Sequence, residues 1–280
     1  MKLLSPKYDV VFHALFREEN KELLSKMLTA IIKEKISVKT IDKNRYVSIK
    51  DANEKLGIMD LVAELENKEI CNIEIQLNYF PNIINRMIYY SDKCYTRQIK
   101  KGEDYSTLKR VISILILDYN LEELKEFDTP VTKWKYREEE TKKTLTSIQT
   151  LVITILPKVI KLYNKNPNDK LCQWLMFIDN PNSKEVQNIM EKNKDIEFAL
   201  SNLEQVSGNE RLKRIAELKE KARRDEKASL NYATEKGLKQ GIKQERKEML
   251  TKMQKAGFSI KQIKEITNLE LDEIKELLEN

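Results

Sequence analysis

Apolar and polar residues alternate along two neighbouring segments, residues 58–66 and 69–77. A period of two is typical of a strand with one buried face, so the two segments predict a β-hairpin that turns near Asn67. The run "RVISILILD" at 110–118 is almost continuously apolar and β-branched, which predicts a central strand covered on both faces.

Helical spacing of apolar residues precedes and follows the hairpin. Residues 5–32 open with Ser-Pro and predict an amphipathic helix or a pair of helices. A further helix is expected from Pro81 to about Lys101, closed by Gly102. The order helix, strands, helix, buried strand indicates a mixed α/β domain.

Weaker patterns fill the rest of the chain. "RYVSIK" at 45–50 is a short strand candidate, and 148–156 predicts another strand, at an edge of the sheet or added late. Residues 123–143 are charged and are expected to form a loop. From about residue 170 onward the pattern is helical, with a turn near Asn268 between two short final helices.

The predicted organisation has three parts. Residues 1–160 form the α/β core, residues 161–207 a helical extension packed on it, and residues 208–280 a basic long helix with a small helical unit. At 280 residues the chain is long enough to bury at least one sizeable core.

Charge is unevenly distributed along the chain. The net charge is +6, but residues 209–255 alone hold 15 Lys and Arg against eight Asp and Glu, while residues 256–280 are net acidic. A basic segment can bind the phosphates of nucleic acid in a salt-dependent way, or it can be a solvated helix with ion pairs between successive turns. The final helices resemble a small helix-turn-helix, but their acidity favours packing or dimerisation over DNA binding.

Several classes of protein are disfavoured. The three cysteines form no CxxC pair and lie in apolar surroundings, which suits reduced thiols of a cytosolic protein. His13 is the single histidine, so a His-rich metal site and a Ser-His-Asp hydrolase are poorly supported. Because no apolar run approaches a membrane span and no secretory signal is visible, a cytoplasmic location is expected.

The polar residues of the hairpin raise the question of a functional site. Asp60 on the first strand and Glu74 on the second each belong to the polar face of their strand. They share one side of the hairpin only if the connecting loop has an odd number of residues, for example three, with Asn67 or Lys68 in the left-handed region. The alternative is that this face of the hairpin is simply solvated.

Two carboxylates on one face repel each other unless a cation lies between them. Oxygen ligands suit Mg²⁺ or Mn²⁺, and such an ion can activate water and neutralise the charge of a phosphodiester. If the two side chains converge, their chemistry is that of a nuclease.

Several stretches together resemble one nuclease family. Asp60 followed by Glu74-Ile75-Gln76 is similar to the PD-(D/E)xK core, with Gln76 where the motif has lysine. The segments "SPKYDVVFHALF", "NIEIQ", "RMIYYSDKCYTRQIKKGEDYSTL" and "VISILILDY", within about residues 4–120, resemble the Rpn recombination-promoting nucleases, which are also described as transposases.

The resemblance implies a restriction-endonuclease-like fold, with a mixed central sheet flanked by helices, and Mg²⁺-dependent or Mn²⁺-dependent cleavage of DNA. It implies Asp60 and Glu74 as metal ligands and Gln76 as the group that positions water. Asp9 matches an acid near the N-terminus of the family and is expected to support the metal site, and Gln98 is expected to bond a scissile oxygen or water.

Each of these side chains also has a structural alternative. An acid such as Asp9 is favoured at a helix N-terminus by the helix dipole. Arg86 and Tyr90 belong to a polar helical stripe that could hold a phosphate or could be solvated. His13 is expected to be a packed residue rather than a base.

Three functional hypotheses follow. The first is a metal-dependent DNA endonuclease associated with recombination or transposition. The second is a catalytically degenerate DNA-binding or transposition accessory protein. The third is an oligomerising scaffold that acts through its C-terminal helices, whose apolar seam also favours a homo-oligomer such as a dimer in the first two cases.

Overall fold

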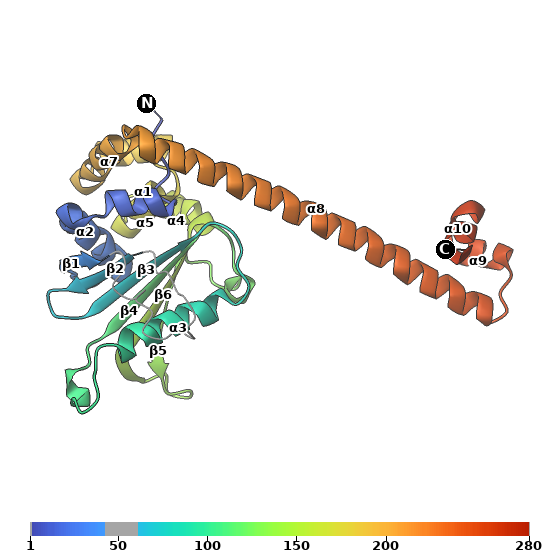
Figure 1. The fold of residues 1–280 in the computed structure, drawn as a ribbon, viewed down its shortest axis with the longest axis horizontal. Helices are drawn as coiled ribbons and strands as arrows, with labels where there is room; N and C mark the ends of the chain where they lie inside the picture. The colour runs from blue at the N-terminus through green and yellow to red at the C-terminus, as the bar shows by residue number, and fades with distance from the viewer. Residues whose placement is uncertain (1, 43–60, 280) are drawn as a thin grey trace. The chain divides into compact units, whose positions relative to one another are not determined.

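A computed structural model describes residues 2–42 and 61–279 of the chain (Figure 1). Contacts between Cα atoms divide the chain into two compact units, Met1–Lys219 and Glu220–Asn280. The long helix α8 begins in the first unit and continues into the second. The three-part organisation expected from the sequence, with its boundary at residue 208, stays a prediction.

The first unit is built on a six-stranded mixed sheet with strand order β1-β2-β3-β4-β6-β5. β3, β4 and β6 run parallel to one another, and the remaining neighbours pair antiparallel. The strands are β1 (Val38–Asp42), β2 (Leu61–Leu65), β3 (Ile70–Gln76), β4 (Val111–Leu117), β5 (Val131–Arg137) and β6 (Thr144–Ile155).

Helices cover both faces of this sheet. Those of the first unit are α1 (Asp9–Leu15), α2 (Lys21–Ile32), α3 (Ile83–Thr96), α4 (Val159–Lys165), α5 (Lys170–Asp179), α6 (Lys184–Met190) and α7 (Lys194–Ser207). α3 crosses one face, and α1, α2 and α5 lie over the other (Figure 1). The mixed α/β class expected from the sequence is confirmed.

The face under α1, α2, α5 and α7 holds the main hydrophobic core. It receives every second residue of the strands, among them Ile73 of β3 and Ile114 of β4, and the fully buried Phe12 of α1 and Trp174 of α5 pack against it. Each large side chain buried in this way contributes about 1.5–3 kcal/mol, so this face dominates the stability of the fold.

The predicted hairpin forms with the predicted parity. Leu61 pairs with Ile73 and Val62 with Asn72, which leaves residues 66–68 as a three-residue turn closed by a bond from the Leu65 amide to the Glu69 carbonyl. Lys68 has a φ of 68°, in the left-handed region that such a turn requires. The odd count directs the apolar residues of both strands toward the same core.

Two expectations about the remaining strands were wrong. The segment 123–143, expected to be a loop, contains β5, an edge strand whose lysines alternate with Thr132, Trp134 and Tyr136. β6 was expected at an edge or as a late addition to the sheet; the edge position is wrong, because β6 is internal and pairs with both β4 and β5. β1 was not predicted, and the strand candidate at 45–50 lies outside the described residues.

The second unit consists of most of α8 (Glu210–Lys255), α9 (Ile260–Thr267) and α10 (Leu271–Glu279). Its small core contains Leu250, Ile263, Ile274 and Leu277. A capping box at Ser259 starts α9, and Asn268, in the left-handed conformation, ends it, as the sequence predicted for the turn.

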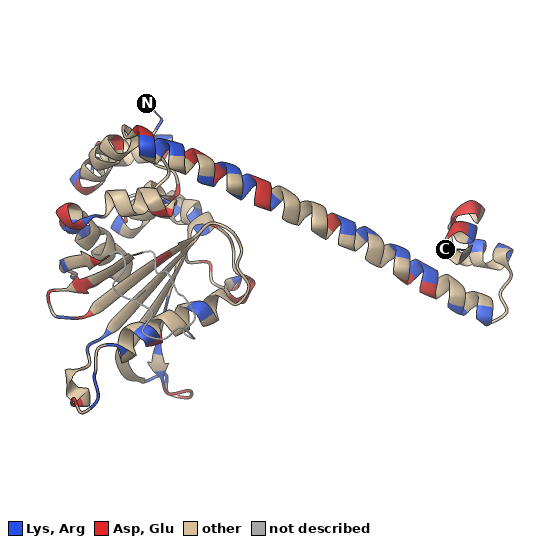
Figure 2. Ribbon diagram, in the orientation of Figure 1, with Lys and Arg blue, Asp and Glu red and all other residues tan. Residues whose placement is uncertain are grey.

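Basic and acidic residues are interspersed along α8 (Figure 2). Several form ion pairs within the helix, such as Arg224 with Glu220 at 2.8 Å, and others reach α10, such as Arg246 with Glu273.

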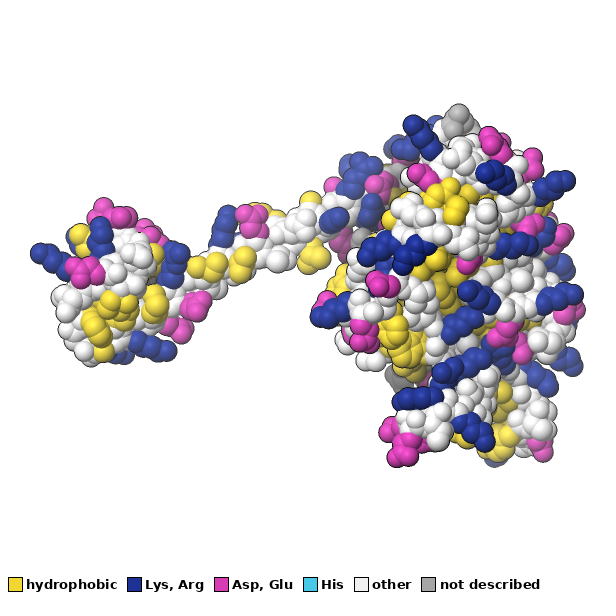
Figure 3. Space-filling view, turned by 180° about the vertical axis from the view of Figure 1, so that it is seen from behind, with side chains coloured by type: hydrophobic (Ala, Val, Ile, Leu, Met, Phe, Trp, Pro, Cys, Tyr) yellow, Lys and Arg dark blue, Asp and Glu magenta, His cyan; other side chains and the backbone are white. Residues whose placement is uncertain are grey.

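Seen from behind, the surface also shows hydrophobic side chains between lysines and arginines (Figure 3). Within the part of the chain that the structure describes, no helix is both long and apolar enough to cross a membrane.

Candidate active site at the carboxyl ends of the parallel strands

Glu74 is a buried acid on the α3 face of the sheet. Its strand, β3, alternates Ile73 and Ile75 toward the main core with Asn72 and Glu74 toward α3, and only 3% of Glu74 is exposed. Glu74 lies two residues from the carboxyl end of β3, where the parallel strands β3, β4 and β6 end together. Ligands of open α/β sheets bind at this edge.

Arg86, in the first turns of α3, is a charged partner of Glu74. Its Nη2 donates to Glu74 Oε2 at 3.2 Å. The guanidinium also lies over the rings of Phe80 and Tyr90, 5.3 Å from each centroid. A cation held by two aromatic faces and a carboxylate is fixed in position, so the geometry around Glu74 is pre-organised.

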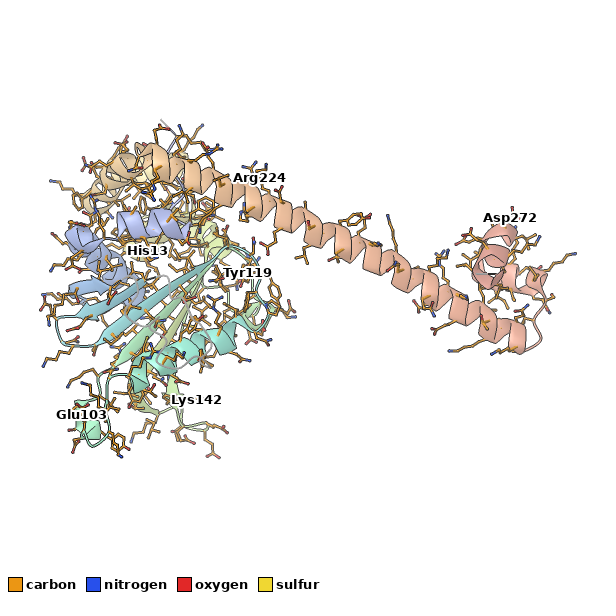
Figure 4. All side chains as sticks on the ribbon, viewed as in Figure 1. His13, Glu103, Tyr119, Lys142, Arg224 and Asp272 are labelled. Atoms are coloured by element: carbon orange, nitrogen blue, oxygen red, sulfur yellow. The ribbon has the colours of Figure 1, made fainter. Side chains whose placement is uncertain are left out.

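Two tyrosines, Tyr90 and Tyr119, lie close enough to Arg86 to be affected by its charge. Tyr119 follows β4 at the edge of the sheet (Figure 4) and packs edge-on against Tyr79, with ring centroids 5.7 Å apart. Burial raises the pKa of both Tyr90 and Tyr119, and the nearby Arg86 opposes that shift in each case. Both phenols therefore remain protonated at neutral pH and can donate hydrogen bonds.

Cys94 lies on the same face as Tyr90, in the small apolar cluster between α3 and the hairpin. Burial raises the pKa of its thiol to about 12. A thiol held protonated in this way is not a nucleophile, so Cys94 contributes packing at this site.

Of the other two predicted hairpin residues, the structure describes Gln76 but not Asp60. Gln76 is the last residue of β3, half-buried, and pairs in register with Leu117 of β4. By strand alternation it belongs to the same face as Glu74. Asp60 lies outside the described residues, so its convergence with Glu74 stays a prediction.

Asp9 starts α1, which packs on the main-core face of the sheet rather than the α3 face. Its Oδ1 accepts from the amide of Val10, and its Oδ2 pairs with Lys219 Nζ at 2.7 Å. The first of these contacts suits a helix N-terminus. The supporting role that the sequence predicts for Asp9 stays a prediction.

Gln98 bonds the backbone just beyond the end of α3, and the catalytic role that the sequence predicts for it stays a prediction. The Gln98 amide bonds the backbone of Lys109 twice, accepting from its N–H at 2.8 Å and donating to its carbonyl at 3.0 Å. This pair of bonds ties the end of α3 to the start of β4. His13, on α1 (Figure 4), is half-buried.

The oxygen atoms of Glu74 and Gln76 are of the type that binds a hard divalent cation. A buried carboxylate and an amide oxygen two residues away are ligands that Mg²⁺ accepts, and Mg²⁺ is often held by only one or two carboxylates with water. Among residues 2–42 and 61–279, no three His, Cys, Asp or Glu side chains cluster as a ready-made metal site. Of the two predicted ligands, Asp60 and Glu74, the structure describes only Glu74.

The aromatic part of the site was missed at the sequence level. Phe80 and Tyr119 come from loops after β3 and β4, and nothing in a local pattern shows that these loops meet. The sequence did contain one signal: acids and aromatics follow two strands that were open to interpretation as parallel neighbours, and ligands bind where such strands end.

A family model described as PD-(D/E)XK nuclease family transposase matches residues 6–233 of the chain. The match covers the whole sheet, α3 and the start of α8. No curated protein and no solved structure matches the chain significantly.

Proposed function

Because the chain belongs to the PD-(D/E)XK nuclease family transposases, which act on DNA, we propose that it is a metal-dependent DNA endonuclease that hydrolyses phosphodiester bonds during recombination or transposition. The buried Glu74 carboxylate, held by Arg86 at the carboxyl edge of the parallel strands, is the observation that carries the proposal. The mixed sheet flanked by helices agrees with the fold of that family.

In this proposal Asp60 and Glu74 hold Mg²⁺, or Mn²⁺ in its place. When bound, such an ion supplies Lewis-acid stabilisation of the phosphate and a water of lowered pKa. Gln76 orients the attacking water by hydrogen bonding, because an amide cannot supply the positive charge of a lysine. Arg86 keeps the Glu74 carboxylate in place and supplies the positive charge that Gln76 lacks.

The test is cleavage of supercoiled plasmid by the full chain with Mg²⁺, with Mn²⁺ and with a chelator. Activity is expected with either ion, with a loss of about 10²–10³-fold or more in Asp60→Ala and in Glu74→Ala. Glu64→Ala is the matched control, because Glu64 is a half-buried acid of the same hairpin that pairs with Lys39 at 3.0 Å. Full activity in both site variants would remove the site assignment.

A second candidate function is a DNA-binding accessory protein that has lost cleavage. The observations that favour it are the glutamine at position 76 and the arginine already bound to Glu74. This alternative predicts that the full chain retards DNA in a gel while leaving plasmid intact with both ions. Plasmid cleavage that Glu74→Ala abolishes would exclude it.

The second unit is proposed to join two copies of the chain. Exposed apolar residues recur along α8, including Leu230, Leu238 and Ile242. A helix with exposed apolar residues is stabilised when a second copy of the chain packs against them. Light scattering of the full chain is expected to give a dimer, and of L230E/L238E a monomer; a monomeric wild-type chain would contradict this role and leave α8 as a solvated, ion-paired helix.

The basic charges of α8 are proposed to add affinity for DNA. The helix contains 46 residues, and part of its positive charge is neutralised by ion pairs within the helix. Removal of residues 209–280 is expected to weaken DNA retardation and to reduce its salt dependence. Unchanged retardation would assign all DNA binding to residues 1–208.

A further inference from the structure

A concave feature lies on the other side of α3 from Glu74. It is a cavity of about 180 Å³ between α3 and the strands β5 and β6. With successive helical residues 100° apart, Arg86 and Ile88 project from nearly opposite sides of α3. The cavity is lined by Ile88, Ser91, Asp92, Trp134, Lys135, Tyr136, Gln149 and Leu151.

Two aromatic rings from the edge strand form its outer wall. Trp134 is 41% exposed and Tyr136 is 52% exposed, although both are large side chains on an ordered strand. The indole N–H of Trp134 donates to Thr132 Oγ1 at 3.0 Å, and Phe127 packs edge-on against the ring at 5.7 Å. The ring is thus held in place while its face stays accessible.

Polar groups that α3 and β6 contribute to the lining are also fixed. Gln149 Nε2 donates to Asp92 Oδ1 at 2.6 Å, and Gln149 Oε1 accepts from the Tyr136 hydroxyl. This relay orients the amide and leaves Asp92 Oδ2 as an acceptor for a ligand. The Ser91 hydroxyl, on a residue only 1% exposed, has no hydrogen-bond partner among the described residues.

Size and charge restrict the ligand. Pockets for drug-sized ligands typically measure about 300–1,000 Å³, so a cavity of about 180 Å³ suits one planar ring system rather than a whole nucleotide. The edge strand, VTKWKYR, carries three basic residues and no acidic one. Its Lys135, at the rim, can contact a phosphate outside the cavity.

We propose that this cavity binds one unpaired base of a DNA strand, stacked on Trp134 and Tyr136, with Asp92 and Ser91 bonding its pairing edge. Base–aromatic stacking is the usual way in which proteins hold single-stranded DNA. The inference rests on the proposed action on DNA, but not on cleavage. It makes α3 a divider between a base-binding side and the Glu74 side.

The two tryptophans of the chain provide a direct test. Trp134 is exposed at the cavity, whereas Trp174 is 1% exposed in the main core, so a change in tryptophan fluorescence on binding reports Trp134. The full chain is titrated in chelator with a single-stranded oligonucleotide and with the same oligonucleotide carrying abasic sites. Quenching is expected with the first, and little with the second, because the phosphates remain but the bases are gone.

Variants then assign the effect to the cavity. Trp134→Ala is expected to weaken binding of the oligonucleotide about 5- to 150-fold, the range typical of one stacked base. Tyr105→Ala, which removes an exposed aromatic outside the cavity, is the matched control and is expected to change little. Trp134→Phe is expected to retain most of the affinity while losing the fluorescence signal.

Three outcomes overturn the proposal. They are equal quenching by the abasic strand, unchanged affinity in Trp134→Ala, and a fluorescence change that follows protein concentration without DNA. The last would assign the cavity to contacts with another copy of the chain or another protein.

Failure of this proposal can be told apart from failure of the proposed function. Plasmid cleavage without oligonucleotide quenching would remove only the base site. Quenching without cleavage would keep the base site and favour the DNA-binding accessory function.

Discussion

The two faces of the central sheet are made from the same strands, yet they differ in composition and cover. Toward α1, α2, α5 and α7 the strands present mostly aliphatic side chains, as at Ile73 and Ile114, with the buried Thr150 and Thr154 of β6 as polar exceptions. Toward α3 they present buried polar groups as well, including Asn72, Glu74 and Ser113.

The two faces also differ in how completely helices cover them. Several helices seal the aliphatic face, whereas α3 covers its face with both flanks bordered by exposed aromatics. Burying polar groups costs free energy unless they are bonded, and the only buried charged group among the described strands, Glu74, lies on the α3 face, which agrees with the proposal that this face carries the chemistry. The opposite face provides the stability that allows it.

The largest contrast in stability and cleavage is expected between variants of two neighbouring residues of β3, Ile73 and Glu74. Ile73→Ala removes a fully buried side chain from the aliphatic face and is expected to lower the free energy of unfolding by about 2–5 kcal/mol. Glu74→Gln keeps the shape of the side chain and is expected to cost less stability but to abolish cleavage. Urea denaturation and plasmid cleavage of both variants measure the contrast; the comparison of faces fails if Ile73→Ala, still folded, also loses cleavage.

A smaller effect is expected within the polar face. The Ser113 hydroxyl donates to Asn72 Oδ1, and both residues are buried. Ser113→Ala leaves that acceptor without its donor and is expected to cost about 1–3 kcal/mol in the free energy of unfolding.

The control for Ser113 is a double-mutant cycle. N72L/S113A removes both partners and is expected to cost less than the two single variants added together. Simple additivity in urea denaturation would show that the bond contributes nothing to the polar face.

The smallest effect is expected at Asp9, which pairs with Lys219 near the surface. Asp9→Asn and Lys219→Gln are each expected to cost less than about 1 kcal/mol, and less again at high salt. The predicted supporting role in catalysis requires that Asp9→Asn alone slows cleavage. Equal cleavage rates in the two variants would withdraw that role.

Much of the scaffold around the site follows from local pattern. Alternation across residues 58–77 predicts the hairpin, and the odd turn with Lys68 in the left-handed region is confirmed. The apolar run at 110–118 predicts β4, and the spacing after Pro81 predicts α3. The type of each of these elements follows from the spacing of its buried residues, and that spacing is visible as the pattern of apolar residues in the sequence.

Other elements depend on partners far away in the chain. β5 was missed because the alternating lysines typical of an edge strand resemble a charged loop, although Trp134 and Tyr136 recur with the period of a strand. The position of β6 inside the sheet depends on strand order, which a single segment does not encode.

The same limit applies to the site. The stripe of Arg86 and Tyr90 was visible as helical spacing, but the ion pair of Arg86 with Glu74 requires α3 to lie on that face. Gln98 matches a family pattern and its amide bonds the backbone of Lys109, while its predicted catalytic role stays a prediction. The convergence of Asp60 with Glu74 stays a prediction.

The hairpin turn at residues 66–68 has a consequence for how this chain can vary. Because successive side chains of a strand point in opposite directions, inserting or deleting one residue there would move Leu61 and Ala63 out of the aliphatic layer. Relatives that keep this sheet should therefore differ in turn length by two residues or by none, and single-residue length changes should be absent from this position.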